Sequence, residues 1–128
     1  MDILELRRYC LSLPLAEECT PFDETTLVFK IGGKMFCYTD MVRFDQLAVK
    51  CDPDEAILLR ERYPDRVVPA FHSNKRHWNG IAVGSDLSDA FIREQIRASY
   101  RLVVGGITPK ARRQELEELI EKTGLPEE

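Results

Sequence analysis

Two short runs of mainly hydrophobic, β-prone residues lie on either side of a glycine pair. The first run is Leu-Val-Phe-Lys-Ile at residues 27–31, and the second is Lys-Met-Phe-Cys-Tyr at residues 34–38. Two adjacent glycines favour a tight turn, because both central residues of such a turn take positive φ. The pattern therefore predicts a β-hairpin. Its expected cross-strand pairs are Ile31 with Lys34, Phe29 with Phe36, and Leu27 with Tyr38.

Strand and helix patterns continue along the rest of the chain. Three more strands are expected at about residues 46–51, 67–68 and 78–83, where β-prone residues cluster or alternate. Four helices are expected at about residues 2–13, 52–63, 88–104 and 108–123, and residues 14–24 are expected to form a loop. The order α-β-β-β-α-β-β-α-α favours an α+β fold, with an antiparallel sheet of about five strands packed by helices.

Helix starts are marked by residues that can satisfy free backbone N–H groups. Asp2 and Asp52 stand at N-cap positions, and Ser88 or Asp86 is expected to open the third helix. Thr108 is expected to cap the last helix, with a proline at its first position. The third helix is expected to bury one stripe, which consists of Ile92, Ile96, Ser99 and Val103.

A chain of 128 residues suits a single domain over residues 1–128, with an acidic C-terminal helix at about 109–123. The hydrophobic fraction of 44% excludes a disordered chain. No apolar stretch approaches the roughly 20 residues that span a bilayer, and the first residues lack the segments of a signal peptide. We therefore expect a cytoplasmic protein with no membrane partner, for which a monomer is plausible.

The formal net charge of −4 is unevenly distributed. Residues 2–24 carry −4 and residues 115–128 carry −5, so the residues between them carry +5. An acidic chain argues against strong non-specific nucleic-acid binding, because that binding depends on cations that neutralise phosphates. The basic centre still allows a local patch.

Catalytic and cofactor motifs are missing. The sequence contains no phosphate-binding loop, dinucleotide fingerprint or nucleophile elbow. The four cysteines do not have the spacing of a zinc or dithiol motif, and we interpret them as reduced side chains. His72 and His77 are the only histidines, and no neighbouring acid completes a metal site. We predict no catalytic residue, no metal and no cofactor.

The densest group of functional side chains is the segment His-Ser-Asn-Lys-Arg-His-Trp at residues 72–78. Lys75 and Arg76 suit phosphate contacts, Asn74 suits a base edge or a phosphate, and the imidazoles and the Trp suit stacking. The structural alternative is that Trp78 belongs to the core while the polar groups cap turns. Arginines recur every four residues on the third helix, either as a second basic element or as a solvated face. The candidate binding residues are His72, Asn74, Lys75, Arg76, His77, Trp78, Arg93, Arg97 and Arg101.

Several of these segments also carry a family resemblance. They are Leu13-Pro14, Glu17-Glu18, Thr20-Pro21-Phe22, Val28 to Phe36, Val49 to Pro53, His72 to Trp78, Ser99-Tyr100 and Leu102 to Val104. With these stretches in this order, the chain resembles the MmcQ/YjbR family of small bacterial proteins up to about Lys110. The resemblance implies an α+β domain likened to the frataxin/CyaY type, and the family is commonly labelled DNA-binding. Ser73 departs from the family pattern, which often has Met there. Iron binding does not carry over, since the first helix offers only Asp2 and Glu5 as acids.

Two hypotheses for function follow. The first is a DNA-binding module without catalysis, which contacts phosphates through the basic central surface. The alternative is a domain that binds a small anionic ligand or another protein in a pocket beside residues 72–78. A concave pocket around Trp78 favours the alternative, whereas a convex basic ridge favours nucleic acid. A third option, an enzyme with His72 or His77 as general base, requires a carboxylate partner that the sequence does not identify.

Overall fold

The computed structural model describes residues 1–128 and contains four helices and one six-stranded antiparallel sheet. The strands are β1 (Glu17–Cys19), β2 (Thr26–Ile31), β3 (Lys34–Asp40), β4 (Gln46–Lys50), β5 (Val67–Pro69) and β6 (Trp78–Ala82). The helices are α1 (Ile3–Ser12), α2 (Pro53–Arg62), α3 (Asp89–Gly105) and α4 (Lys110–Thr123). Within the sheet the strand order is β1-β2-β3-β4-β6-β5. The expected α+β class is confirmed, with six strands instead of about five.

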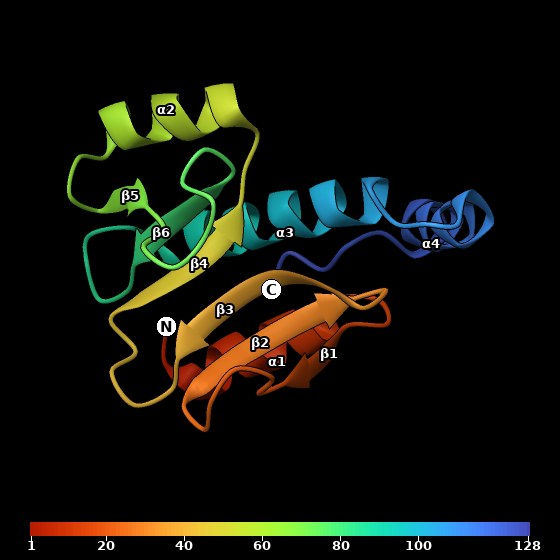
Figure 1. Cartoon of the computed structure of the whole chain (residues 1–128), viewed down its shortest axis with the longest axis horizontal. Helices are drawn as coiled ribbons and strands as arrows, with labels where there is room; N and C mark the ends of the chain where they lie inside the picture. The colour runs from red at the N-terminus through yellow and green to blue at the C-terminus, as the bar shows by residue number, and fades with distance from the viewer.

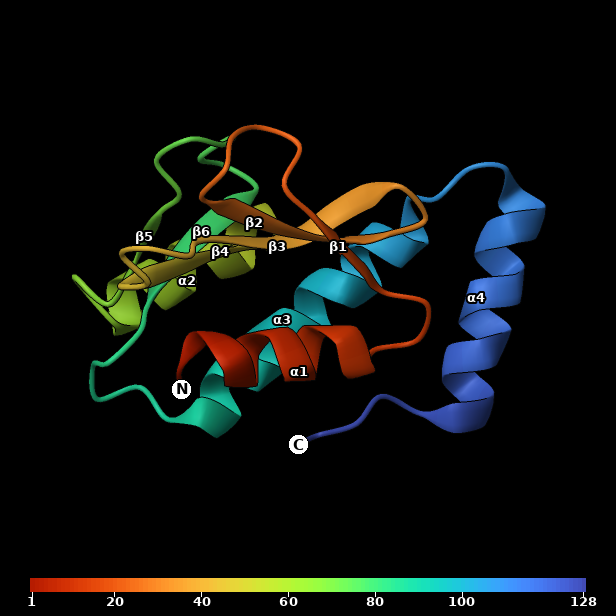
Figure 2. The ribbon, with the colours of Figure 1, turned by 90° about the horizontal axis from the view of Figure 1, so that it is seen from below.

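Helices cover only one face of this sheet. Figure 2 shows α1 and α3 on one side, while the loops that precede β2 and β6 rise on the other side. We call that second side the open face. The helix α2 lies beside β5 (Figure 1), and α4 stands at the far end of the molecule. None of the four helices combines the length and the apolarity needed to cross a bilayer.

The main core fills the space between the sheet and the helices. The predicted apolar stripe of α3 is buried in full, including the polar member Ser99. Side chains from β2, β3, β4 and β6 meet this stripe, and Leu116 of α4 joins the same cluster. A separate small cluster on the open face consists of Ala48, Ala70 and Trp78.

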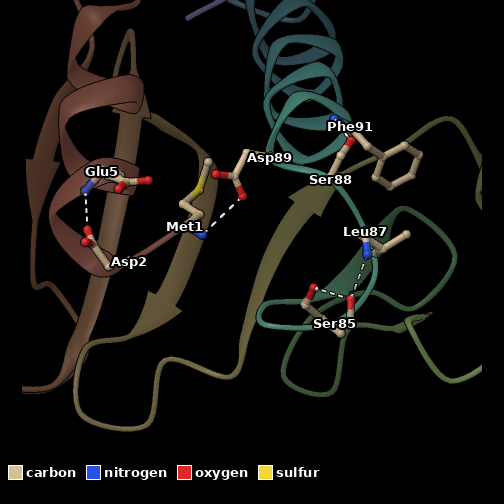
Figure 3. Close-up of polar contacts among 9 residues, drawn as sticks. Met1, Asp2, Glu5, Ser85, Leu87, Ser88, Asp89 and Phe91 are labelled. Carbon is tan, nitrogen blue, oxygen red and sulfur yellow. Dashed lines mark hydrogen bonds and ion pairs between the residues drawn. The ribbon is translucent and has the colours of Figure 1, made fainter.

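Three of the four helices begin at the N-cap residue that the sequence predicts. The carboxylate of Asp2 accepts from the backbone N–H of Glu5 at 2.8 Å, and Ser88 accepts from Phe91 at 3.0 Å (Figure 3). Asp52 caps α2 in the same way. Figure 3 also shows the Met1 amino group bound to Asp89, which joins the start of α1 to the start of α3.

The fourth cap differs from the prediction. The N-cap residue of α4 is Pro109, and no side chain accepts a hydrogen bond there, so Thr108 does not cap this helix. The expected start is therefore shifted by a residue, as commonly happens at helix ends, where sequence signals are weakest. The end at Gly124, which has φ of 71°, agrees with the prediction.

The strand β1 lies where the sequence predicts only a loop at residues 14–24. It has three residues, too few to show an alternating pattern, and it pairs with the outer edge of β2. The carboxylate of Glu18 in this strand accepts hydrogen bonds from Arg7 Nε at 2.9 Å and Nη2 at 2.5 Å. Contacts with β2 and α1 therefore define a strand that local sequence does not.

The hairpin of β2 and β3 forms as predicted, but its register changes partway along. Ile31 pairs with Lys34 across the two glycines, and an irregularity follows between Phe29 and Lys30. Beyond it Phe29 pairs with Cys37, not with Phe36, and every later pair is offset by one residue. This is the pattern of a β-bulge, in which two residues of one strand oppose one of the other.

The bulge reverses the face that the end of β3 presents. Tyr38 was expected opposite Leu27 on the core side, but it pairs with Val28 and packs against the open-face cluster. Cys37 takes the core side in its place. A one-residue shift exchanges the two faces of a strand, because side chains alternate along it.

Candidate functional site

The segment between β5 and β6 forms an exposed loop on the open face. Phe71 is 78% exposed, and His72, Asn74, Lys75 and Arg76 are also exposed. We call residues 71–76 the β5–β6 loop. It presents two aromatic rings, an amide and two cations to solvent from one short stretch of chain.

Arg60 of α2 holds the base of this loop in place. Its Nε donates to Asn79 Oδ1 at 2.8 Å, and its Nη2 donates to the carbonyl of Trp78 at 3.3 Å and to that of Lys75. The Lys75 contact ties the backbone beside the two cations to a helix. Arg60 could not be predicted as a site residue, because nothing in the sequence of α2 indicates that one of its arginines turns toward a distant loop.

Internal hydrogen bonds complete the turn of the loop. The Asn74 side-chain oxygen accepts from the backbone N–H of Arg76 at 3.0 Å, and the Asn74 carbonyl accepts from His77 N–H at 3.0 Å. The His77 carbonyl in turn accepts from Cys51 N–H at 2.7 Å. Asn74 therefore shapes the loop through its oxygen, while its NH2 group makes no bond within the protein.

Tyr38 supports the loop from the sheet. Its hydroxyl is hydrogen-bonded to Ser73, and its ring centroid lies 5.7 Å from that of Trp78. Partial burial raises the pKa of the Tyr38 hydroxyl, which keeps it protonated at neutral pH. Ser73, the position that departs from the family pattern, thus gains a partner on β3. The bulge explains why Tyr38 reaches this side at all.

Trp78 is buried beneath the loop and is not part of the exposed surface. It is 8% exposed and packs with Ala48 and Ala70. The aromatic ring that is exposed at this surface is that of Phe71, which was not among the residues predicted from sequence. The rings of Phe71 and His72 meet edge to face, with 4.9 Å between their centroids. Lys75 Nζ lies 5.9 Å from the Phe71 ring centroid.

A cavity of about 520 Å³ adjoins the loop on the open face. It lies between the segment before β2 and the β5–β6 loop, and strands β3 and β4 contribute to its lining. Its residues are Phe22, Asp23, Thr25, Thr26, Met35, Tyr38, Thr39, Asp40, Asp45, Gln46, Leu47, Ala48, Ala70, Phe71, His72 and Ser73. Three aspartates and no Lys or Arg line it, so the lining is acidic. A pocket for the anionic ligand considered in the sequence analysis would need a basic lining.

The arginine stripe of α3 does not join the loop. Arg93 Nε donates to the carbonyl of Glu127 at 2.9 Å, and Arg97 Nη1 donates to the Tyr9 hydroxyl at 2.9 Å. Both side chains thus hold the returning C-terminal segment against α1 and α3. Arg101 is exposed, next to Glu117 and Glu121 of α4. Since α3 and the loop lie on opposite sides of the sheet (Figure 2), the two basic elements do not converge.

Thiols and metal ligands offer no second centre. Cys10 and Cys37 are buried together, and burial raises the pKa of the Cys10 thiol. Burial also raises the pKa of Cys51, to about 11. Thiols with such values stay protonated at neutral pH and are poor nucleophiles. No group of three or more His, Cys, Asp or Glu residues is close enough to hold a metal ion.

Comparisons with known proteins agree on one family. A model of the YjbR family matches residues 11–102. The uncharacterized protein YbdF of Escherichia coli O157:H7 is 37% identical over 105 residues, which cover 81% of this chain and 85% of that protein. The uncharacterized protein YjbR of Escherichia coli strain K12 is 32% identical over 120 residues, covering 93% and 100%.

Solved structures show the same fold. The crystal structure of Deinococcus radiodurans protein DR2400, which has a DUF419 domain, superposes with a TM-score of 0.83 at 34% identity. It covers 98% of this chain and 90% of its own. A Pseudomonas syringae protein superposes with a TM-score of 0.69 at 21% identity, over 80% of this chain and 99% of its own.

Proposed function

This chain belongs to the YjbR family, and we propose that it is a DNA-binding module without catalytic activity, which holds single-stranded DNA on the β5–β6 loop. One observation carries this proposal. The loop exposes Phe71 and His72 beside Lys75 and Arg76, on a base fixed by Arg60. Aromatic rings interleaved with cations are the arrangement that binds single strands, since bases stack on the rings while cations track the phosphates.

The balance of rings and cations favours single strands over duplex. Bases in a duplex stack on one another, so their faces are not free for Phe71 or His72. Duplex binding without base contacts depends on many phosphate contacts, and this loop supplies only Lys75 and Arg76. The free NH2 group of Asn74 adds two N–H donors for a base edge or a phosphate.

The surroundings of His72 and His77 also favour a role in binding over a role in proton transfer. A histidine general base is usually oriented by a carboxylate that accepts from its second nitrogen. Neither His72 nor His77 has a hydrogen bond or ion pair with a carboxylate. We therefore expect His72 to stack with bases beside Phe71, and His77 to contribute to the backbone turn.

The test is fluorescence anisotropy of labelled single-stranded and duplex DNA at several salt concentrations. With two phosphates neutralised on a single strand, the slope of log affinity against log salt is expected near −1.4, at about −0.7 per contact. Lys75→Ala/Arg76→Ala should flatten this slope. Phe71→Ala should weaken single-strand binding by about fivefold or more, because one stacked base contributes about 1–3 kcal/mol.

The matched control is Lys110→Ala/Arg112→Ala, which removes two exposed cations from α4. It should leave both affinity and slope unchanged. The proposal fails if the unaltered protein binds neither strand type at micromolar concentration. It also fails if the control variant weakens binding as much as the loop variant, because bulk charge would then explain the effect.

A further inference from the structure

The cavity on the open face has the size of a ligand site. Its volume of about 520 Å³ falls within the roughly 300–1,000 Å³ of small-molecule pockets. The loop before β2 forms one side and the start of the β5–β6 loop forms the other, and Figure 2 shows both loops rising from the same face of the sheet. Lys75 and Arg76, the proposed phosphate contacts, are not among its lining residues.

Aromatic side chains that folding leaves uncovered contribute to the lining. Phe22 is 66% exposed and Phe71 is 78% exposed, and both line the cavity from opposite loops. Tyr38 and the apolar floor of Ala48 and Ala70 lie deeper. Rings that are left this exposed beside a concave site offer their faces to a bound molecule.

The charge of the lining selects the sign of the ligand. Asp23, Asp40 and Asp45 line the cavity, and no lysine or arginine does. Hydrogen bonds from the backbone and side chain of Thr26 lower the pKa of Asp23, so this carboxylate is ionised at neutral pH. Arg43 approaches Asp45 at 3.8 Å, but both side chains are highly exposed, and such a pair is weak.

Backbone hydrogen bonds fix two of these carboxylates without neutralising them. Asp23 Oδ1 accepts from the N–H groups of Thr25 and Thr26, and Asp40 Oδ1 accepts from those of Val42 and Arg43. The second oxygen of Asp40 has no partner within the protein. A carboxylate held in this way keeps its charge and acceptor capacity for a ligand.

We propose that this cavity binds an organic cation, in which an ammonium or guanidinium-like group is attached to an apolar or aromatic body. The cationic group would bind Asp40 and Asp45 through charge-assisted hydrogen bonds, and the body would pack on Phe22, Phe71 and Tyr38. Aromatic faces attract cations as well as apolar groups, so both halves of the lining favour the same molecule. This inference does not depend on DNA binding.

The probe is benzamidinium, compared with benzoate, which has a similar shape and the opposite charge. We expect benzamidinium to shift backbone amide signals in residues 22–26, 38–48 and 70–73 in two-dimensional NMR spectra. The affinity should be about millimolar, which is common for a fragment of this size. Benzoate should leave the same signals unshifted at equal concentration.

The decisive variant is Asp40→Asn/Asp45→Asn, which keeps side-chain size and leaves Asn able to cap the turn. We expect it to weaken benzamidinium binding at least about fivefold, through loss of two charged acceptors. The matched control is Asp54→Asn/Glu118→Gln, which removes two exposed acids outside the cavity and should leave the affinity unchanged.

Any one of the following outcomes would overturn the inference: no shifts up to about 20 mM probe, which is well above the millimolar range, equal shifts with benzoate, or equal weakening by the control variant. Failure of DNA binding is separable from these. The Arg76→Ala variant should bind benzamidinium as the unaltered protein does, because Arg76 does not line the cavity and makes no hydrogen bond to a residue that does. Loss of benzamidinium binding in that variant would also contradict the inference.

Discussion

Ser99 is the polar member of an otherwise apolar helix stripe, and it is fully buried. Its Oγ donates to the Phe36 carbonyl at 2.6 Å and accepts from the Lys50 N–H at 2.8 Å. The ladder between β3 and β4 ends at the pair of Cys37 and Val49. The hydroxyl therefore takes over where the next ladder bonds would form, and it links α3 to both strands.

Removing this hydroxyl should destabilise the fold. Ser99→Ala leaves the part-buried Lys50 N–H and the buried Phe36 carbonyl without partners, so we expect a loss of about 1–3 kcal/mol in the free energy of unfolding. Urea denaturation measures the change. Ser12→Ala removes an exposed hydroxyl that bonds within its own helix and serves as the control. Equal stability of Ser99→Ala and the unaltered protein would contradict this role.

At the scale of elements, the bulge in the first hairpin connects the core to the candidate site. It lets Phe36 and Cys37 both face the core, and it directs Tyr38 to the open face. There Tyr38 bonds Ser73 and lines the cavity. Arg60 has the matching role from α2, since it holds the loop from below. Two elements far apart in sequence thus define one surface.

Besides its pairing with β2, the short strand β1 makes one ion pair with α1, between Glu18 and Arg7. The hydrogen bond from Arg7 lowers the pKa of Glu18 below its ordinary value of 4.5. A carboxylate whose pKa is lowered in the folded state stabilises that state fully when the pH is above the ordinary pKa. This stabilisation is lost as the pH falls through the lowered pKa. Because both side chains are partly exposed, its size is at most about 1 kcal/mol.

Glu18→Gln tests this linkage. Near pH 6 the variant should be less stable than the unaltered protein by up to about 1 kcal/mol. The difference should shrink as the pH falls below about 4.5, because the unaltered carboxylate becomes protonated. Urea denaturation series between pH 3 and pH 6 provide the measurement. A difference that does not change with pH would mean that charge on Glu18 contributes nothing.

At the scale of the whole molecule, the sheet separates two surfaces. The open face carries the β5–β6 loop and the cavity, whereas the helical face carries the arginine stripe and the returning C-terminal segment. Carbonyl groups of that segment accept from Tyr9, Arg93 and Arg97. The acidic residues 115–128 therefore do not cover the β5–β6 loop: their last residues contact α1 and α3, on the opposite side of the sheet.

Deleting residues 125–128 should therefore leave single-strand binding at the loop unchanged. The deletion removes three carbonyl contacts on the opposite side, so we expect a lower free energy of unfolding by about 1–2 kcal/mol. Anisotropy titration and urea denaturation measure the two effects. A gain in DNA affinity after deletion, lost again with Arg93→Ala/Arg97→Ala, would place a phosphate contact on α3 instead.

Sequence by itself determined the local features of this protein. The caps at Asp2, Asp52 and Ser88, the glycine turn and the buried stripe of α3 all depend on residues within a few positions of one another. The α+β class and the family follow from the order of these elements and from motifs along the chain. The loop at residues 72–78 could be selected from its composition alone.

Tertiary structure decided what the loop presents and what lies beside it. The strand β1 and the bond from Arg60 depend on partners distant in sequence, and no local pattern indicates either these contacts or the bulge. Packing buries the Trp78 side chain and leaves that of Phe71 exposed. Asp23 from the loop before β2 and Asp40 and Asp45 from the β3–β4 turn meet at one cavity for the same reason. The charge of a site depends on which segments converge, and packing across the sheet sets that convergence.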